Sequence, residues 1–232
     1  MRTDVIFLLV YVNDILITGS SNSSLTQLIS QLSTTFSLQD LGEAHYFLGL
    51  ELHRTIDSVH LSQRKYIHDL LVKTKMHKAK PIHTLMVAST KLDVTHGSPL
   101  LDATKYRNVV GALQYITLTR PDISFSVNKV CHFMKEPTDV HWSAVKRIIR
   151  YLKSTIDHVI IFCSSQELAL EAFSGADWAS CPVDRRSQGG FCVYLGRNLI
   201  SWSFRKQSTV SRSSTESKYR SLASTITELL WL

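Results

Sequence analysis

Two separate stretches of the sequence carry polar and acidic residues of the types that ligate metal ions. The first is the pair Asn13-Asp14, which interrupts apolar residues at 5–12 and 15–18. β-Branched and aromatic residues on both sides of a short polar pair are typical of a tight hairpin. We therefore expect Asn13 and Asp14 at the tip of a buried β-ribbon. An acidic residue placed there either forms the turn or ligates a metal, and the residue types alone leave both open.

The second stretch lies toward the C-terminus, where Asp177 stands two residues after Gly175 and Glu216 stands three after Ser213. In a strand, residues two apart point to the same face, so Asp177 would share a face with position 175. The Ser213-x-x-Glu216 spacing also fits a capping box at a helix N-terminus, which needs no catalysis. Both interpretations of Glu216 therefore stand.

The spacing of apolar residues predicts the elements that position these side chains. Alternation predicts strands near both ends of the chain, and spacings of three, four and seven predict helices. Pro81, Gly97 and Pro99 mark a loop or linker at 77–102. A change to an alternating period from His158 predicts a second α/β unit, with a boundary near 154–166.

The expected elements follow one another along the whole chain. They are a helix capped by Ser24; a strand at 46–53 that turns through 55–58 into 59–61; a helix capped by Ser62; helices at 106–117, from Pro121 and from Thr138; strands at 159–162, 168–173, 191–195 and 199–204; and a helix from about Thr215. We expect the last helix to bury its apolar residues, Tyr219, Leu222, Ala223, Ile226, Leu229 and Leu230.

Composition and charge narrow the class of protein. Of the 232 residues, 44% are hydrophobic and 19% charged, which favours a globular chain over a disordered one. The net charge of +7 and pI near 9.3 fit a nucleic-acid partner, although many basic proteins bind none. The longest apolar run, 5–12, is far short of the ~20 residues that a membrane helix needs. We expect a soluble, non-secreted chain with no membrane partner.

The cysteines and the remaining reactive residues argue against several other chemistries. The 4 cysteines contain no Cys-x-x-Cys pair, which argues against a zinc site and favours a reduced intracellular compartment. The choice between cytoplasm, nucleus and mitochondrial origin stays open. Ser213 and Ser214 lie in no Gly-x-Ser-x-Gly elbow, and Gly189-Gly190 is too short to cradle a phosphate.

Basic side chains gather on two predicted elements. The helix from Thr138 carries Lys146, Arg147 and Arg150 outside its apolar face, and Arg205 and Lys206 belong to a basic stretch opposed only by Glu216. Such faces are usually just solvated, but they can also bind phosphates. Trp202 and Phe204 lie within the second stretch, where core packing is their commoner use.

Several segments, in order along the chain, resemble polyproteins of copia-type retrotransposons. Tyr11-Val12-Asn13-Asp14 resembles the Tyr-x-Asp-Asp box of their reverse transcriptase, with Asn13 where the first carboxylate stands. The other similar segments are 49–53 (the primer-grip hairpin), 106–115 and 119–124 (thumb to connection), and 173–179, 185–191 and 211–216 (the start of ribonuclease H). In extent, the chain is similar to uncharacterised open reading frames of plant mitochondrial and nuclear genomes.

The resemblance implies an α+β fold in pieces. An incomplete reverse transcriptase palm with a helical thumb and connection would be followed by a truncated ribonuclease H-like α/β unit. The implied boundaries are 1–76 for the late palm, primer grip and thumb start, 77–157 for the linker and helical thumb or connection, and 158–232 for the first half of ribonuclease H. A partner strand of the palm would precede Met1, and a third ribonuclease H carboxylate would lie beyond Leu232.

The resemblance also implies a chemistry, namely RNA-directed DNA synthesis and cleavage of the RNA in a hybrid by two-metal carboxylate sites. Asp14 and Glu216 would be catalytic, and Mg²⁺ would bind Asp14, Asp177 and Glu216. The partners would be an RNA template, a DNA primer or an RNA–DNA hybrid, and the rest of the polyprotein. The residues expected to contact nucleic acid are Gly49, Glu51, His53, Lys146, Arg147, Arg150, Arg205 and Lys206.

Two substitutions argue against activity in this chain. Asn13 and Gly175 stand where the family has carboxylates, and losing one preorganised electrostatic group costs on the order of 10² to 10³ in rate. We therefore expect an inactive remnant of the reverse transcriptase and ribonuclease H. The alternatives are an active enzyme, a non-catalytic module that binds an RNA–DNA hybrid, and a vestigial product. Binding that falls steeply with salt would support the module, and a chain that cannot fold cooperatively would leave the vestigial product.

Overall fold

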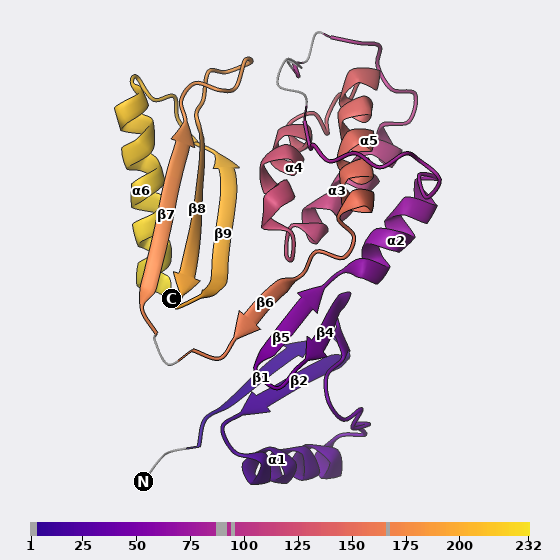
Figure 1. The fold of residues 1–232 in the computed structure, drawn as a ribbon, viewed down its shortest axis with the longest axis vertical. Helices are drawn as coiled ribbons and strands as arrows, with labels where there is room; N and C mark the ends of the chain where they lie inside the picture. Colours follow the sequence, from indigo (N-terminus) through magenta and orange to yellow (C-terminus); the bar gives the residue numbers. More distant parts are fainter. Residues whose placement is uncertain (1–3, 87–91, 94–95, 166–167) are drawn as a thin grey trace. The chain divides into compact units, whose positions relative to one another are not determined.

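The computed structural model describes residues 4–86, 92–93, 96–165 and 168–232 (Figure 1). The chain divides into two compact units, residues 1–53 and 54–232. None of the described helices is both long and apolar enough to cross a membrane.

The first unit opens with a β-hairpin, as the sequence predicts. Strands β1 (Ile6–Tyr11) and β2 (Asp14–Gly19) pair antiparallel over their whole length. The expectation that this ribbon is buried is wrong, because none of the described residues 4–53 is buried and Phe7 is 67% exposed. One helix beside a two-stranded ribbon cannot cover both of its faces.

Helix α1 (Asn22–Thr35) follows the hairpin and begins earlier than expected. Its cap is Ser21, whose backbone is extended and whose hydroxyl accepts a hydrogen bond from the N–H of Ser24 at 3.4 Å. The predicted cap at Ser24 is therefore wrong by about one turn. Serines at both positions can cap a helix, and the apolar spacing alone does not choose between them.

A second hairpin replaces the single strand expected at 46–53. Strands β3 (Tyr46–Phe47) and β4 (Leu50–Arg54) pair antiparallel, with Phe47 opposite Leu50. Leu48 and Gly49 between them have φ values of 48° and 76°. Two consecutive left-handed residues are the geometry of a two-residue hairpin turn, so the predicted strand is broken at its middle.

Helices form the core of the second unit. Their apolar sides meet in one cluster, in which the side chains of Tyr106, Leu113 and Ile148 are 0% exposed. The predicted buried sides of the helices at 106–117 and after Thr138 are thus confirmed. The elements of this core are α2 (Arg64–Lys73), α3 (Ala103–Ile116), a 3-10 turn at Pro121–Ile123, α4 (Ser124–Cys131) and α5 (Asp139–Ser154).

The start of α5 is fixed by a capping box, as its predicted cap requires. The Thr138 N–H donates to Nδ1 of His141 at 3.0 Å, while the Thr138 side chain accepts from the third backbone N–H of the helix. His141 is buried, stacks on Phe133 with ring centroids 3.8 Å apart, and contacts the Asp93 carbonyl oxygen through Nε2 at 3.0 Å. Burial lowers the pKa of His141, with the Asp93 contact opposing the shift.

A buried arginine joins the end of α5 to the turn after α3. Arg120 is 2% exposed and donates to both carboxylate oxygens of Asp122 at 2.9 and 2.7 Å. It also donates to the carbonyl and hydroxyl oxygens of Thr155 at 2.8 and 2.7 Å. Burial alone raises the pKa of Asp122, but hydrogen bonds from Arg120 and Tyr151 outweigh it and the pKa lies below its ordinary value.

Strand pairing ties the two ends of the helical core together. Strand β5 (Ser58–Ser62) directly precedes α2 and pairs antiparallel with β6 (Ile160–Cys163), which follows α5. Backbone hydrogen bonds between residues about 100 apart in sequence thus close the core, and Leu61 lies opposite Ile160.

The C-terminal part of this unit is a three-stranded antiparallel sheet covered by one helix (Figure 1). The strands are β7 (Leu170–Asp177), β8 (Gln188–Leu195) and β9 (Asn198–Lys206), with β8 in the middle, and the helix is α6 (Ser214–Trp231).

Helix α6 turns a polar side to the sheet, so its predicted apolar buried face is wrong. Ser217, Ser221 and Thr225 are its buried residues, whereas Tyr219 is 67% exposed. Gly189 of β8 gives the physical reason. A Cβ at Gly189 would lie 3.2 Å from the Ser221 Oγ, so the helix approaches the sheet too closely for large side chains. Also exposed on its outer side are Leu222, Ile226 and Leu230.

Candidate carboxylate sites and nucleic-acid interface

The tip of the first hairpin has its turn one residue earlier than expected. The two turn residues are Val12 and Asn13, and Asp14 is the first residue of β2, opposite Tyr11. Val12 has a φ of 49°, in the left-handed region that β-branched residues rarely adopt. Asp14 is exposed. The tip therefore presents one carboxylate to solvent with a neutral amide beside it.

In the second acidic stretch, the packing of α6 on β7 sets the position of the segments that carry Asp177 and Glu216. The Trp178 indole N–H donates to the Ser211 carbonyl oxygen at 2.9 Å, which holds the start of α6 beside the end of β7. Asp177 is the exposed last residue of that strand, and Glu216 lies in the first turn of the helix. A Cβ at Gly175 would meet no atom within 4 Å, so the site has room for the carboxylate that the sequence lacks.

Glu216 is engaged by its own helix terminus. Its N–H donates to the Ser213 Oγ at 3.1 Å, which confirms half of the predicted capping box. Its carboxylate accepts from the Arg212 N–H at 2.8 Å, one residue before the expected donor, and from the Arg220 guanidinium at 2.8 Å. The Arg212 hydrogen bond and the Arg220 guanidinium lower the pKa of Glu216. The carboxylate is thus held ionised by groups that stabilise the helix.

The described residues do not fit a Mg²⁺ site. Among them, no three His, Cys, Asp or Glu side chains gather closely enough to hold a metal ion. Mg²⁺ is normally held by carboxylates and substrate phosphates, whereas Asn13 is neutral and Gly175 has no side chain. Asp14, Asp177 and Glu216 belong to no such group among the described residues, and their metal role stays a prediction.

The residues predicted to contact a primer lie on the β3–β4 hairpin. Gly49 is in the turn with its φ of 76°, where a side chain would be strained. Glu51 is half-buried opposite Tyr46, and His53 is exposed near the end of β4. The turn of this hairpin falls at 48–49 instead of the predicted 55–58, and its contact with nucleic acid stays a prediction.

Basic side chains of α5 hold the chain's own backbone. They bind the stretch at 77–84, which therefore lies along the helix and not free in solvent. The hydrogen bonds run from Arg147 to the Thr84 hydroxyl, from Arg150 to the Lys80 carbonyl oxygen (2.7 Å), and from Lys153 to the carbonyl oxygens of His77 and Ala79 (2.8 and 2.9 Å). Of the three α5 residues predicted to bind nucleic acid, only Lys146 is fully exposed.

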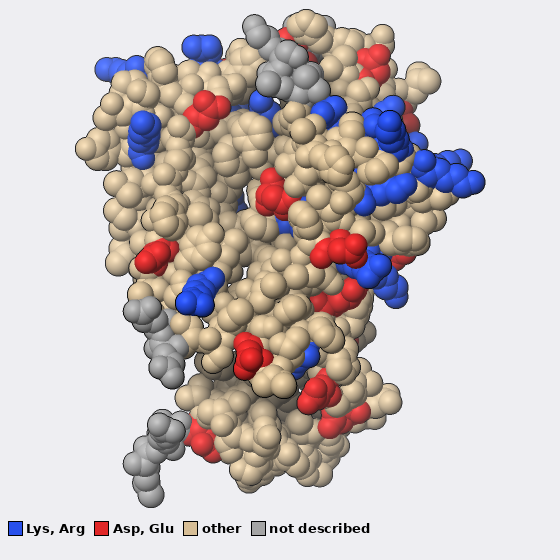
Figure 2. Space-filling model, viewed as in Figure 1, with Lys and Arg blue, Asp and Glu red and all other residues tan. Residues whose placement is uncertain are grey.

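The end of α2 and this fastened stretch present lysines that the sequence interpretation did not single out. We call residues 73–80 the basic segment. Its lysines, Lys73, Lys75, Lys78 and Lys80, are exposed, and within the described ranges none forms an ion pair with an acidic side chain. Lys and Arg side chains gather over the α2 and α5 side of this unit in Figure 2. The sequence does indicate this basic segment, because it contains no Asp or Glu at 70–92.

The two basic residues predicted on β9 differ in their surroundings. Lys206 donates to Asp184 at 2.9 Å and to the Cys181 Sγ at 3.7 Å. Burial alone raises the pKa of Asp184, but hydrogen bonds from Cys181 and Lys206 hold it well below its usual range. Arg205 is exposed and borders a cleft. Lys206 is thus committed to an internal ion pair, and Arg205 is available to a ligand.

Comparisons with known proteins agree on one family. A family model described as reverse transcriptase (RNA-dependent DNA polymerase) matches residues 2–88. The Pol polyprotein from transposon RE2 of Arabidopsis thaliana is 49% identical over 98% of the chain, but the chain spans only 16% of that polyprotein. No solved structure matches.

Shorter relatives match over most of their own length. An uncharacterised mitochondrial protein of Arabidopsis thaliana is 48% identical over 97% of the chain and 93% of that protein. A putative Ty5-1 transposon protein of Saccharomyces cerevisiae is 30% identical over 97% of the chain and 74% of that protein. The chain therefore belongs to the family of copia-type retrotransposon Pol polyproteins and carries part of their reverse transcriptase domain.

Proposed function

We propose that the chain derives from a retrotransposon reverse transcriptase with ribonuclease H and performs neither reaction. One observation carries this: at both expected metal sites a neutral residue, Asn13 or Gly175, takes the place of a carboxylate. Glu216 does not compensate, because both of its oxygens already accept hydrogen bonds. Two closely spaced cations need several carboxylates to offset their charge.

The same proposal gives each part of the chain an origin in the ancestral polyprotein. Residues 1–76 would derive from the late palm, the primer grip and the start of the thumb, and 77–157 from a linker with the helical thumb or connection. Residues 158–232 would derive from the first half of ribonuclease H. The order of a β-hairpin, a helical core and an antiparallel sheet covered by α6 supports this division.

A primer-extension and cleavage gel tests the loss of chemistry. The purified chain receives a labelled RNA template annealed to a DNA primer with Mg²⁺, alongside the variants Asp14→Ala and Glu216→Ala. We expect neither primer extension nor RNA cleavage from any of the three proteins. A product that disappears in one of the variants would show a working site and contradict the proposal.

A gain-of-function variant sharpens the same test. Gly175→Asp adds a carboxylate where the structure has open space, and Asn13→Asp restores charge at the exposed hairpin tip. Neither change disturbs a buried side chain, so both variants should fold. RNA cleavage that returns with Gly175→Asp alone would show that this one substitution caused the loss.

A second candidate function, a module that binds an RNA–DNA hybrid without chemistry, is favoured by the basic segment. Its four exposed lysines form no ion pair with an acidic side chain among the described residues. Lys78 and Lys80 lie on the stretch held to α5 by hydrogen bonds, whereas Lys73 ends α2 and Lys75 follows it. Because α2 belongs to the core and the stretch after it is fastened, these charges lie on a fixed surface. Each phosphate contact releases counterions and makes binding weaken with salt.

A gel shift at several salt concentrations tests this binding. Replacing Lys73, Lys75, Lys78 and Lys80 with Gln should lower the slope of log affinity against log salt by about 0.7 to 0.9 per lost contact. The matched control is Lys135→Gln with Lys218→Gln, two lysines outside the basic segment. An equal change in slope in both proteins would refute a specific role for the segment.

A further inference from the structure

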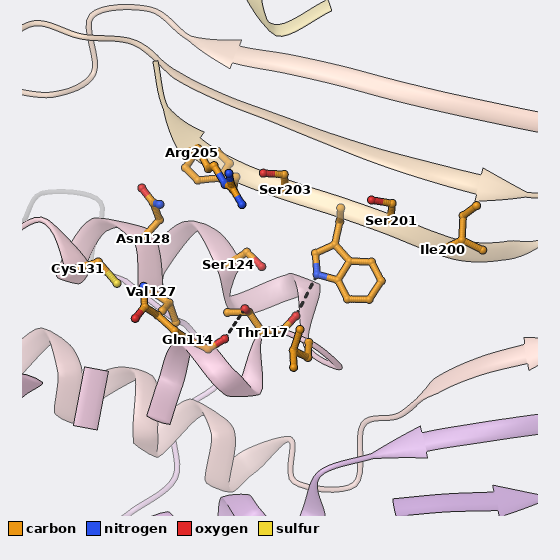
Figure 3. Close-up of a pocket in the computed structure, with 13 residues that line it drawn as sticks. Gln114, Thr117, Ser124, Val127, Asn128, Cys131, Ile200, Ser201, Ser203 and Arg205 are labelled. Carbon is orange, nitrogen blue, oxygen red and sulfur yellow. Dashed lines mark hydrogen bonds between the residues drawn. The ribbon is translucent and has the colours of Figure 1, made fainter. Parts of the chain in front are cut away.

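A cleft of about 440 Å³ lies in the second unit between the α3–α4 region and strand β9 (Figure 3). Its helical wall comes from the end of α3 and from α4, and its other wall is residues 200–205 of β9. The chain's sequence brings these walls together from segments about 70 to 90 residues apart. The expected metal sites lie outside this cleft, and Arg205 alone of the residues expected to contact nucleic acid lines it.

The two walls are tied at fixed points, so the cleft is formed without a ligand. The Trp202 indole N–H donates to the Thr117 carbonyl oxygen at 3.0 Å, as Figure 3 shows. The rings of Phe125 and Phe204 meet edge to face with centroids 4.9 Å apart. A preformed site does not have to be ordered at the moment of binding, which favours affinity.

Two polar side chains of the cleft have a buried atom without a partner in the described structure. Ser124 Oγ and Asn128 Oδ1 are buried and accept no hydrogen bond from the described residues. A buried polar atom without a partner is costly and calls for an explanation, such as a ligand or ordered water. Gln114 adds a second amide at the rim, exposed to solvent.

The charge of the lining selects an anionic ligand. Arg205 is the one charged residue among those lining this cleft, and no Asp or Glu is among them. Its guanidinium is exposed, and Figure 3 shows the side chain on the β9 wall beside Ser203 and facing the α4 side. A guanidinium is well suited to bidentate binding of a phosphate.

We propose that this cleft binds a nucleoside monophosphate unit, with the base toward Asn128 and the phosphate at Arg205. Side-chain amides pair a donor with an acceptor, as the edge of an adenine does. Trp202 and Phe204 supply aromatic surface for the base. The volume lies within the range of small-molecule sites. The unit is either a free nucleotide or an unpaired nucleotide of a single strand.

Calorimetric titration with adenosine 5′-monophosphate, ribose 5-phosphate and adenosine tests the proposal on the full chain. We expect saturable binding of the monophosphate at millimolar or lower concentration, about tenfold tighter than ribose 5-phosphate, because the base adds hydrogen bonds and aromatic contact. Absence of saturable binding in the millimolar range, or equal binding of ribose 5-phosphate, would overturn the proposal.

Two variants test which residue binds the base of the ligand and which binds its phosphate. Asn128→Ala should weaken the monophosphate about tenfold and leave ribose 5-phosphate unchanged, whereas Arg205→Gln should weaken both phosphates and spare adenosine. The controls are Asn108→Ala and Arg197→Gln, which lie outside the cleft. Matching losses in the control proteins would overturn the assignment.

Folding and the source of the nucleotide are checked separately. Because Asn128 Oδ1 has no partner in the described structure, Asn128→Ala should keep the native circular dichroism; if it does not, Gln114→Ala at the rim replaces it. Competition by a short single-stranded oligoadenylate identifies an unpaired nucleotide as the ligand, and no competition identifies a free one. The inference is independent of hybrid binding by the basic segment, since each has its own variants.

Discussion

The N-terminal hairpin and the helical core of the second unit differ in the solvent exposure of their apolar residues. In the hairpin, the apolar residues of β1 remain largely exposed, with Phe7 at 67%. In the core, Tyr106, Leu113 and Ile148 are fully shielded. Both regions are rich in aliphatic and aromatic residues, so composition does not explain the difference.

The number of packed layers explains it. Helices α3, α4 and α5 each contact the other two, and a buried cluster forms where their apolar sides meet. A two-stranded ribbon with a single helix has no third layer to shield its second face, and isolated two-stranded hairpins are marginally stable. The stability of the chain therefore resides in the helical core.

Hydrogen exchange should give the largest contrast between the two regions. Backbone amides of β1 should exchange orders of magnitude faster than those of α3, because local opening ranges from nearly free to the full cost of global unfolding. Mass spectrometry of peptic peptides from one exchange series measures both regions together. Equal protection of β1 and α3 would break the comparison.

Removing the buried arginine should cost the most among single substitutions. Arg120→Ala leaves Asp122 and the Thr155 oxygens without their donor, and breaking a buried ion pair costs roughly 3–5 kcal/mol. Urea unfolding measures the change in the free energy of unfolding. The control is Arg107→Ala on the exposed side of α3, which should change stability by less than about 0.5 kcal/mol.

A matched pair of leucines compares the regions directly. Leu113→Ala opens a cavity in the core and should cost about 2–5 kcal/mol, while Leu9→Ala on the exposed ribbon should cost less than about 1 kcal/mol. Both proteins lose the same side-chain atoms, so urea unfolding isolates the effect of burial. A large loss from Leu9→Ala would show that β1 is buried in solution.

The smallest expected effect is a dependence of core stability on pH. Because the pKa of buried His141 lies below its ordinary value of 6.5, the unfolded chain takes up a proton more readily than the native one. This contribution is fully present above pH 6.5 and is lost as the pH falls below it. Urea midpoints at a series of pH values measure the slope.

Substituting His141 tests whether this residue causes the pH dependence of stability. His141→Gln should flatten the pH dependence between neutral and mildly acidic pH, and His158→Gln, at an exposed position, should leave it unchanged. His132, whose pKa burial also lowers, contributes to the same slope. An unchanged slope in His141→Gln would contradict the assignment.

The helices of the core could be predicted from sequence because their apolar spacing and their burial agree. Thr138 and the residues that follow it illustrate this, since cap, helix start and buried side all match. The turn at Val12 could not be predicted, because a β-branched residue at positive φ is disfavoured and only the pairing of β1 with β2 imposes it.

Contacts between distant segments also could not be predicted from the sequence. The inner side of α6 depends on Gly189 of β8, which no pattern within the helix reveals. The cleft depends on α4 and β9 packing together, with Asn128 on one wall and Arg205 on the other. The basic segment spans the boundary between the predicted thumb start and the predicted linker. Asp177 and Glu216 could be named from sequence, yet the engagement of Glu216 by Arg220 required the structure.

The outward apolar side of α6 has a consequence for how the protein behaves in concentrated solution. Tyr219, Leu222, Ile226 and Leu230 face solvent on a molecule with a net charge of +7. At low ionic strength, mutual repulsion keeps such molecules apart, and added salt screens that repulsion while leaving the apolar stripe attractive. Colloidal stability should therefore decline as salt is raised, and dilute, low-salt buffers are the conditions that keep the chain dispersed.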